Sequence, residues 1–284
     1  RSQGVATFVG AIMVSELCAP GIGGILADRL GERSVFAIGA GIMLLSALVG
    51  SSVLTRRVVP DRRRAPRSQD LTLHAIRNPR FITLLLTAAI PAKFALTAFM
   101  FYIVPVGLAS LDIPKAEIGR VAMLYAIPSV LAASLFARLA DRMGCAGLMV
   151  GVGSMISGAG FLPLLFWPSE TAIVIGVLAL GLGHAMSISP QLALVTEICS
   201  EEISRSGGGG VLGIYRLVER IGAALGPVVA GALVAQLGPL EAAGMLGMIS
   251  FVSGVTFSVA FLVVGVHPEK NLFSEDLTQK ENPA

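Results

Sequence analysis

The sequence contains little charge for its length, and this scarcity excludes a large class of proteins. Charged residues make up 14% of the 284 residues, whereas soluble domains carry about 25%. Hydrophobic residues account for 54%, and the mean hydropathy is +0.80. Because polar side chains are too few to cover a globule of this size, the composition excludes a water-soluble protein.

Cysteine and histidine are also scarce, with three residues of each. Cys18, Cys145 and Cys199 form no CxxC pair, so the sequence indicates neither a disulfide framework nor a metal site. The three histidines cannot form the HExxH motif of zinc peptidases, and no Gly-Lys pair or GxSxG segment exists for a P-loop or a serine hydrolase. We therefore expect no enzyme, no metal and no cofactor.

Long apolar runs dominate what is present. A helix that spans a bilayer needs about 20 mostly apolar residues, and eight runs meet this criterion. They lie at roughly 4–27, 34–54, 81–109, 120–140, 146–166, 171–198, 211–237 and 242–265. The runs are continuously apolar rather than alternating, which favours helices over a barrel. The sequence thus predicts an all-α polytopic membrane protein with about eight transmembrane helices.

The basic residues cluster between these spans, so the net charge of +3 does not indicate nucleic-acid binding. Segment 56–80 holds eight arginines against two aspartates, and the positive-inside rule therefore predicts that it lies in the cytoplasm. Counting spans outward also places loops 138–142 and 199–210 there, together with the tail after His267. We expect a multi-pass protein of the cell (inner) membrane.

An internal repeat links the first and seventh spans. Residues 19–26 align with residues 226–233 at an offset of 207, and Leu30-Gly31 then lies opposite Leu237-Gly238. Small residues recur at matching positions of both spans, and such residues allow helices to approach closely in lipid. Generic packing explains small residues alone, but the matched proline and the matched Leu-Gly pair favour a duplication.

The repeated segments resemble a motif of the major facilitator superfamily. Gly213, Gly222, Gly226 and Pro227 have the spacing of that family's antiporter motif, which is normally found in its fifth helix. The first span carries a partial version of the motif, with Pro20, Gly23 and Gly24 in place. The resemblance predicts that these glycines pack a close helix crossing.

A second resemblance concerns the loop between helices two and three of each half in that family. Residues 139–144, which include Asp141, Arg142 and Gly144, are similar to this loop motif, and so are residues 24–33. If the first span were the family's second helix, however, the arginine-rich segment would lie outside the cell. The resemblance therefore implies helices five to twelve, and it makes Asp141 and Arg142 a conformational loop that contacts neighbouring helix ends.

This assignment divides the chain into four parts. Residues 1–55 correspond to the last two helices of the N-terminal half, and residues 56–80 to the basic cytoplasmic central loop. Residues 81–266 form the C-terminal six-helix half, and residues 267–284 form a polar cytoplasmic tail. Because Arg1 leads directly into a span without a signal peptide, we expect that further N-terminal helices of the same protein precede it.

Ionisable residues inside spans are costly and are candidates for function. Glu16, Lys93 and His184 lie near the centres of their spans, and the resemblance puts Lys93 and His184 on helices that line the family's central cavity. We expect these three in substrate binding or proton coupling, although Glu16 could be a protonated core carboxyl and His184 a packing histidine.

A second charged group, Arg216, Glu219 and Arg220, lies towards the cytoplasmic end of its span. Arg216 and Glu219 are three residues apart and can pair along one helix face. We expect an intramembrane ion pair that is mainly structural.

Together these features predict a secondary active transporter that moves a small solute by alternating access, with proton coupling and with efflux as its direction. The expected partners are the solute, protons and membrane lipid, without nucleic acid. Drugs, sugars, amino acids and organic anions are all compatible with the three central ionisable residues. The alternative function is a transporter-like sensor or scaffold module that carries out no transport.

Overall fold

The computed structural model describes residues 15, 18–54, 77–206 and 209–263, and all regular structure within these ranges is helical. Seven helical segments are long and apolar enough to cross a membrane. The prediction of an all-α polytopic protein is therefore confirmed. The expected first span at 4–27 falls largely outside the described residues, although residues 18–30 are helical.

The helices follow the predicted spans closely, and three spans are built from consecutive segments. These are α2 (Glu32–Leu54), α4 (Pro79–Leu84), α5 (Ile90–Ala98), α6 (Val104–Ala109), α7 (Lys115–Leu124), α8 (Ala126–Met143), α9 (Ala146–Ala159), α10 (Glu170–Ile198), α11 (Ser200–Ser206), α12 (Gly209–Leu237) and α13 (Pro239–Val263). Short π-helical turns, η1 (Leu85–Ala89) and η2 (Phe99–Ile103), connect α4 to α5 and α5 to α6, and the 3₁₀ turn η3 (Leu162–Leu165) follows α9.

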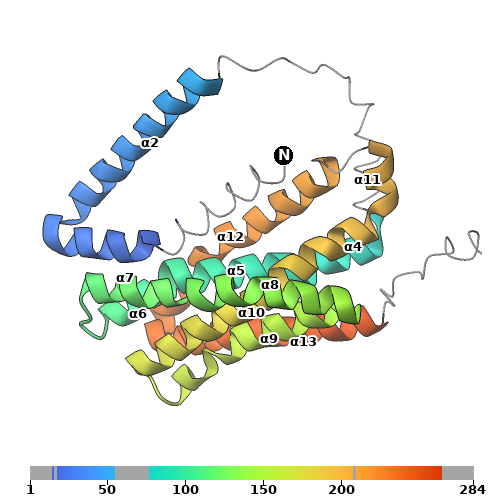
Figure 1. Cartoon of the computed structure of the whole chain (residues 1–284). Helices are drawn as coiled ribbons and strands as arrows, with labels where there is room; N and C mark the ends of the chain where they lie inside the picture. Colours follow the sequence, from blue (N-terminus) through green and yellow to red (C-terminus); the bar gives the residue numbers. More distant parts are fainter. Residues whose placement is uncertain (1–14, 16–17, 55–76, 207–208, 264–284) are drawn as a thin grey trace, which may run out of the picture.

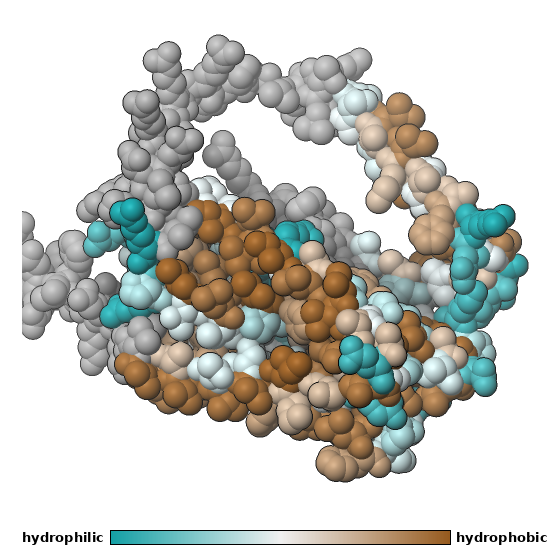
Figure 2. All heavy atoms as spheres, turned by 180° about the vertical axis from the view of Figure 1, so that it is seen from behind, coloured by the Kyte–Doolittle hydropathy of each residue, from teal (hydrophilic) through white to brown (hydrophobic). Residues whose placement is uncertain are grey.

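Six of the seven spans form one bundle, and α2 projects away from it (Figure 1). The outer surface of the bundle is apolar, with Phe101, Leu131 and Leu262 all more than 65% exposed. Figure 2 shows hydrophobic residues over much of one face and hydrophilic residues gathered towards its ends. This distribution suits a bilayer, whose acyl chains solvate apolar side chains.

Glycines allow the bundle helices to touch at the backbone. A Cβ atom at Gly153 of α9 would lie 2.5 Å from the carbonyl oxygen of Gly183 in α10. On its other side, a Cβ atom at Gly158 would lie 2.5 Å from the carbonyl oxygen of Gly247 in α13. α9 is therefore held between α10 and α13 by close approaches that larger side chains would prevent.

The antiporter-like motif of α12 packs against α5, with one exception. A Cβ atom at Gly222 would lie 2.5 Å from the carbonyl oxygen of Ile90, and one at Gly226 would lie 2.7 Å from that of Phe94. Gly213 is exposed and has no described atom within 4 Å of such a position. Among the described residues, the predicted close crossing is thus seen at Gly222 and Gly226 and not at Gly213. Gly213 precedes Gly222 by nine residues, which is two and a half turns at 3.6 residues per turn, so the two face opposite sides.

The partial motif in the first span is divided in the same way. Gly24 lies against the backbone of α7 at Lys115, and the carbonyl of Pro20 lies against Gly119 of α7. Gly23 has open space where a side chain would be. Pro20 and Gly24 thus belong to a close contact with α7, whereas Gly23 does not.

Candidate functional site

Three of the predicted ionisable residues lie at similar depth in the bundle. Lys93 is 14 residues beyond the start of α4, His184 is 14 residues before the end of α10, and Glu219 is 10 residues beyond the start of α12. These helix ends lie at the same end of the bundle (Figure 1). At about 1.5 Å per residue the three side chains begin about 15 to 21 Å from that end, which brings them together.

Glu219 is the centre of a charged group drawn from two helices. Arg216 Nη1 donates a hydrogen bond of 2.8 Å to Glu219 Oε2, and Lys93 Nζ lies 3.9 Å from Glu219 Oε1. The Glu219 side chain is 7% exposed, whereas those of Lys93 and Arg216 are 26% and 62% exposed. The structure therefore contains the Arg216–Glu219 pair, and it adds Lys93 from α5 as a looser second cation. Arg220 is exposed and lies outside this group.

His184 is buried and is held by a tyrosine from another span. The hydroxyl of Tyr125 lies 2.6 Å from His184 Nδ1, and the two rings meet edge to face with centroids 5.9 Å apart. Tyr125 occupies the break between α7 and α8. Ser129, one turn later, donates a hydrogen bond of 3.1 Å to the carbonyl of Gly181 in α10. These contacts fix the orientation of the imidazole ring.

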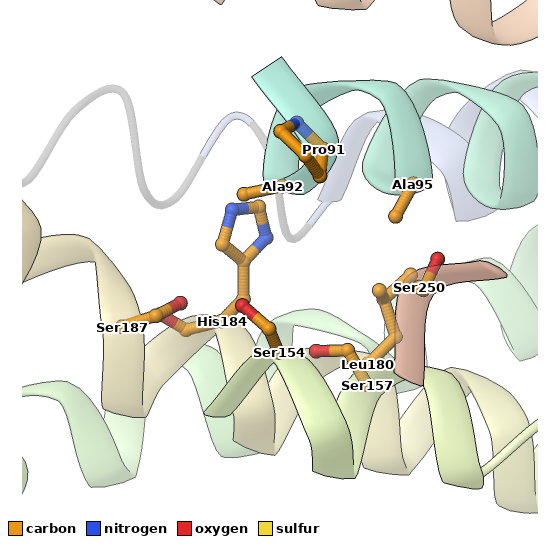
Figure 3. Close-up of a pocket in the computed structure, with 9 residues that line it drawn as sticks. All are labelled: Pro91, Ala92, Ala95, Ser154, Ser157, Leu180, His184, Ser187 and Ser250. Carbon is orange, nitrogen blue, oxygen red and sulfur yellow. The ribbon is translucent and has the colours of Figure 1, made fainter. Parts of the chain in front are cut away.

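A first pocket opens beside His184 (Figure 3). It is lined by Pro91, Ala92, Ala95, Ser154, Ser157, Leu180, His184, Ser187 and Ser250. Ser154, Ser157 and Ser187 each donate to the carbonyl four residues earlier in their own helix, at 2.9 to 3.0 Å. Their hydroxyl oxygens keep lone pairs that can still accept hydrogen bonds.

A second pocket adjoins the first, because Ala92 and His184 line both. Its remaining lining residues are Lys93, Ile188, Gln191, Leu192, Tyr215, Arg216 and Glu219. The charged group and His184 therefore face a common space among α5, α10 and α12. Within the described residues, Gln191 Nε2 in this pocket and Ser250 Oγ in the first are buried without a hydrogen-bond partner.

Sequence reasoning missed Tyr125, Gln191, Tyr215 and Ser250. All four are uncharged, and neutral polar residues are common in apolar spans, so none stands out as Lys93 does. Gln191 offered one signal, since it follows His184 by seven residues and seven residues return a helix to nearly the same face. Partners from other spans cannot be read from such spacing.

One predicted ionisable residue and the expected absence of a metal remain. Glu16 lies outside the described residues. No group of three His, Cys, Asp or Glu side chains that could hold a metal occurs within the part of the chain that the structure describes.

The predicted contact of Asp141 and Arg142 with neighbouring helix ends is not seen among the described residues. Both side chains are exposed, and within the described ranges neither forms a hydrogen bond or an ion pair. α8 ends at Gly144 in a left-handed conformation with φ of 60°. The chain then passes through Cys145 directly into α9.

The similar pattern at 24–33 does contact another helix. Asp28 Oδ2 accepts a hydrogen bond of 2.6 Å from the backbone N–H of Ala116 at the start of α7. Lys115 Nζ lies 2.6 Å from Glu32 Oε1 at the start of α2. A carboxylate at a helix N-terminus satisfies an otherwise unpaired N–H and complements the helix dipole. We call Asp28, Glu32, Lys115 and Ala116 the end clamp.

The broken apolar helices, their lipid-compatible surface and the buried charged group define a polytopic membrane protein with an internal polar site. The chain belongs to the Major Facilitator Superfamily, whose family profile matches residues 1–209 and also 94–283. It is a multi-pass integral membrane protein.

Vesicular acetylcholine transporters are among the similar curated proteins. The proteins of Mus musculus and Rattus norvegicus are each 28% identical over 255 residues, which cover 84% of this chain and 45% of theirs. The Homo sapiens protein is 26% identical over 246 residues. The chain thus spans about half the length of these relatives.

Proposed function

We propose that this chain supplies helices five to twelve of a secondary active transporter, which moves a small organic solute by alternating access. The observation that carries the proposal is the buried carboxylate of Glu219, held by Arg216 and approached by Lys93, in the second of two adjoining pockets at mid-depth. Charges inside a membrane span are costly and are retained where a solute or an ion passes.

Proton coupling follows from the unequal contacts of Glu219. The carboxylate is tightly hydrogen-bonded to Arg216 at 2.8 Å and lies 3.9 Å from Lys93. A proton on Glu219 would remove the charge that attracts Lys93, so proton occupancy and the position of Lys93 are linked. His184, beside the same pocket, and Glu16, placed at mid-span by sequence, are the other candidate proton carriers.

The proposed class of solute rests on the similar curated proteins, and the proposed direction of transport rests on the antiporter-like motif. The name of the vesicular acetylcholine transporters gives their solute as acetylcholine, a small organic cation with a carbonyl group. On this basis we propose a small organic solute for the present chain. The antiporter-like motif around Gly222 and Pro227 favours proton exchange and efflux. For this chain we propose the cell membrane, with segment 56–80 in the cytoplasm.

Flux measured in proteoliposomes that contain the full-length protein tests the proposal. We expect accumulation of a labelled solute from a panel that includes acetylcholine, an organic anion and a sugar, and a dependence of that accumulation on an imposed pH gradient. We expect Glu16→Gln to keep folding and solute binding but to lose this dependence. Unchanged pH-driven accumulation in Glu16→Gln would reduce Glu16 to packing. Absence of flux for every solute in folded protein would refute the transporter and favour a sensor or scaffold.

A further inference from the structure

Gln191 is a buried polar residue to which the proposed function gives no role. It lies on α10 on the same face as His184, and it is 3% exposed. Its Nε2 atom has no hydrogen-bond partner among the described residues, and the residue lines the second pocket. Burying an amide donor without a partner costs free energy, so such an atom needs an explanation outside the packing of the helices.

The second pocket holds more donors than acceptors. Lys93 Nζ is 3.9 Å from Glu219, which is longer than a hydrogen bond, so its donors are not consumed there. Among the described residues, Glu219 is the only carboxylate lining the pocket, and Arg216 already holds one of its oxygens. Gln191 Nε2 adds two further N–H groups. The donors of Lys93 and of Gln191 Nε2 in this space can therefore pair with an acceptor oxygen of a bound solute.

The adjoining pocket also holds a buried hydroxyl that has no partner among the described residues. Ser250 Oγ is buried without a partner, unlike Ser154 and Ser157, which donate to carbonyls of their own helix. A hydroxyl can donate one hydrogen bond. The two unpartnered atoms thus lie in pockets that meet at His184 and Ala92.

We infer that Gln191 determines specificity by donating a hydrogen bond to a carboxylate or carbonyl oxygen of the transported solute, with Lys93 as the charged partner of that oxygen. The inference rests on the proposed transport function and names the chemical class of its solute. A solute with such an oxygen at one end satisfies Nε2 and Lys93 together. A solute that offers only donors at that end leaves Gln191 Nε2 and Lys93 without an acceptor.

Three probes of matched size test the inference on the purified full-length protein in detergent. Benzoate carries an anionic acceptor, benzamide a neutral carbonyl and benzylamine a cationic donor on the same ring. We expect benzoate and benzamide, but not benzylamine, to raise the melting temperature of the wild type. Stabilisation by benzylamine alone, or by none of the three, overturns the inference.

Variants of Gln191 separate binding from packing. We expect Gln191→Leu to weaken binding of benzoate and benzamide at least tenfold, and to melt without ligand no lower than the wild type, because it removes an unpaired amide. Thr196→Val, at an exposed position of the same helix, is the control. We expect benzoate and benzamide to raise its melting temperature as they raise that of the wild type. Retained binding in Gln191→Leu, or a lower melting temperature without ligand, assigns Gln191 to packing and overturns the inference.

The binding result is independent of the flux result. Probe binding without flux of any solute refutes transport but leaves the acceptor-binding site standing. Flux that persists unchanged in Gln191→Leu, for a solute with a carbonyl or carboxylate group, refutes the role of Gln191 and leaves transport standing.

Discussion

Gly222 and Gly213 lie on the same helix and differ only in what surrounds them. The backbone of Ile90 fills the space that a Gly222 side chain would need, whereas no described atom lies within 4 Å of a Cβ atom at Gly213. We expect Gly222→Leu to destabilise the protein by about 1–3 kcal/mol or more through overpacking and to abolish flux. Gly213→Leu is the matched control and should keep both melting temperature and flux. Equal losses in the two variants would contradict the assigned crossing of α12 and α5.

Arg216 and Arg220 form a second matched pair. Arg216 donates a charge-assisted hydrogen bond to the buried carboxylate of Glu219, and Arg220 is exposed. Arg216→Gln should therefore cost about 1 kcal/mol or more, because it removes the closest cation from the buried carboxylate of Glu219. Arg220→Gln should change stability by no more than about 0.5 kcal/mol. Chemical denaturation in detergent measures both, and an equal cost for the two would show that the ion pair adds nothing.

At the scale of elements, the end clamp joins the first helix, α2 and α7. Asp28 caps the N-terminus of α7 through the N–H of Ala116, and loss of an N-cap costs about 0.5–2 kcal/mol. We expect Asp28→Ala to speed hydrogen exchange of the first-turn amides of α7, measured by mass spectrometry. Arg29→Ala, at the next residue of the same helix, is the control and should leave exchange unchanged. Unaltered exchange in Asp28→Ala would mean that the hydrogen bond between Asp28 and Ala116 does not stabilise the first turn of α7.

Sequence predicts the structure best for features that depend on a single membrane span. The apolar runs predict the helices because bilayer thickness sets their length, and the rarity of charge singles out Lys93 and Glu219. Contacts between spans were not predictable. The Tyr125–His184 hydrogen bond depends on how α7, α8 and α10 meet, and the surroundings of Gln191 depend on how α5, α10 and α12 meet, which no local pattern encodes. Gly213 was a different case, since its opposite face follows from helix geometry alone.

At the scale of the whole molecule, the cysteines test the orientation. Cys145 is half-buried at the start of α9, whereas Cys199 is fully buried after α10. Burial raises the pKa of the Cys199 thiol to about 12, so it stays protonated at neutral pH, and the thiolate is the reactive form. In a Cys18→Ala background we expect an impermeant maleimide to label Cys145 only from the cytoplasmic side and Cys199 from neither side. Labelling of Cys145 in intact cells would overturn the assigned orientation.

The π-helical turns η1 and η2, on either side of α5, have a mechanical consequence. A π turn holds one residue more than the α-helical turn it replaces, and each residue of an α-helix turns the chain by about 100°. If the extra residue of one π turn moved to the other, α5 would rotate about its own axis by about 100°. The length of the whole span would stay unchanged. Lys93 would then swing away from Glu219 while the ends of the span stayed in place.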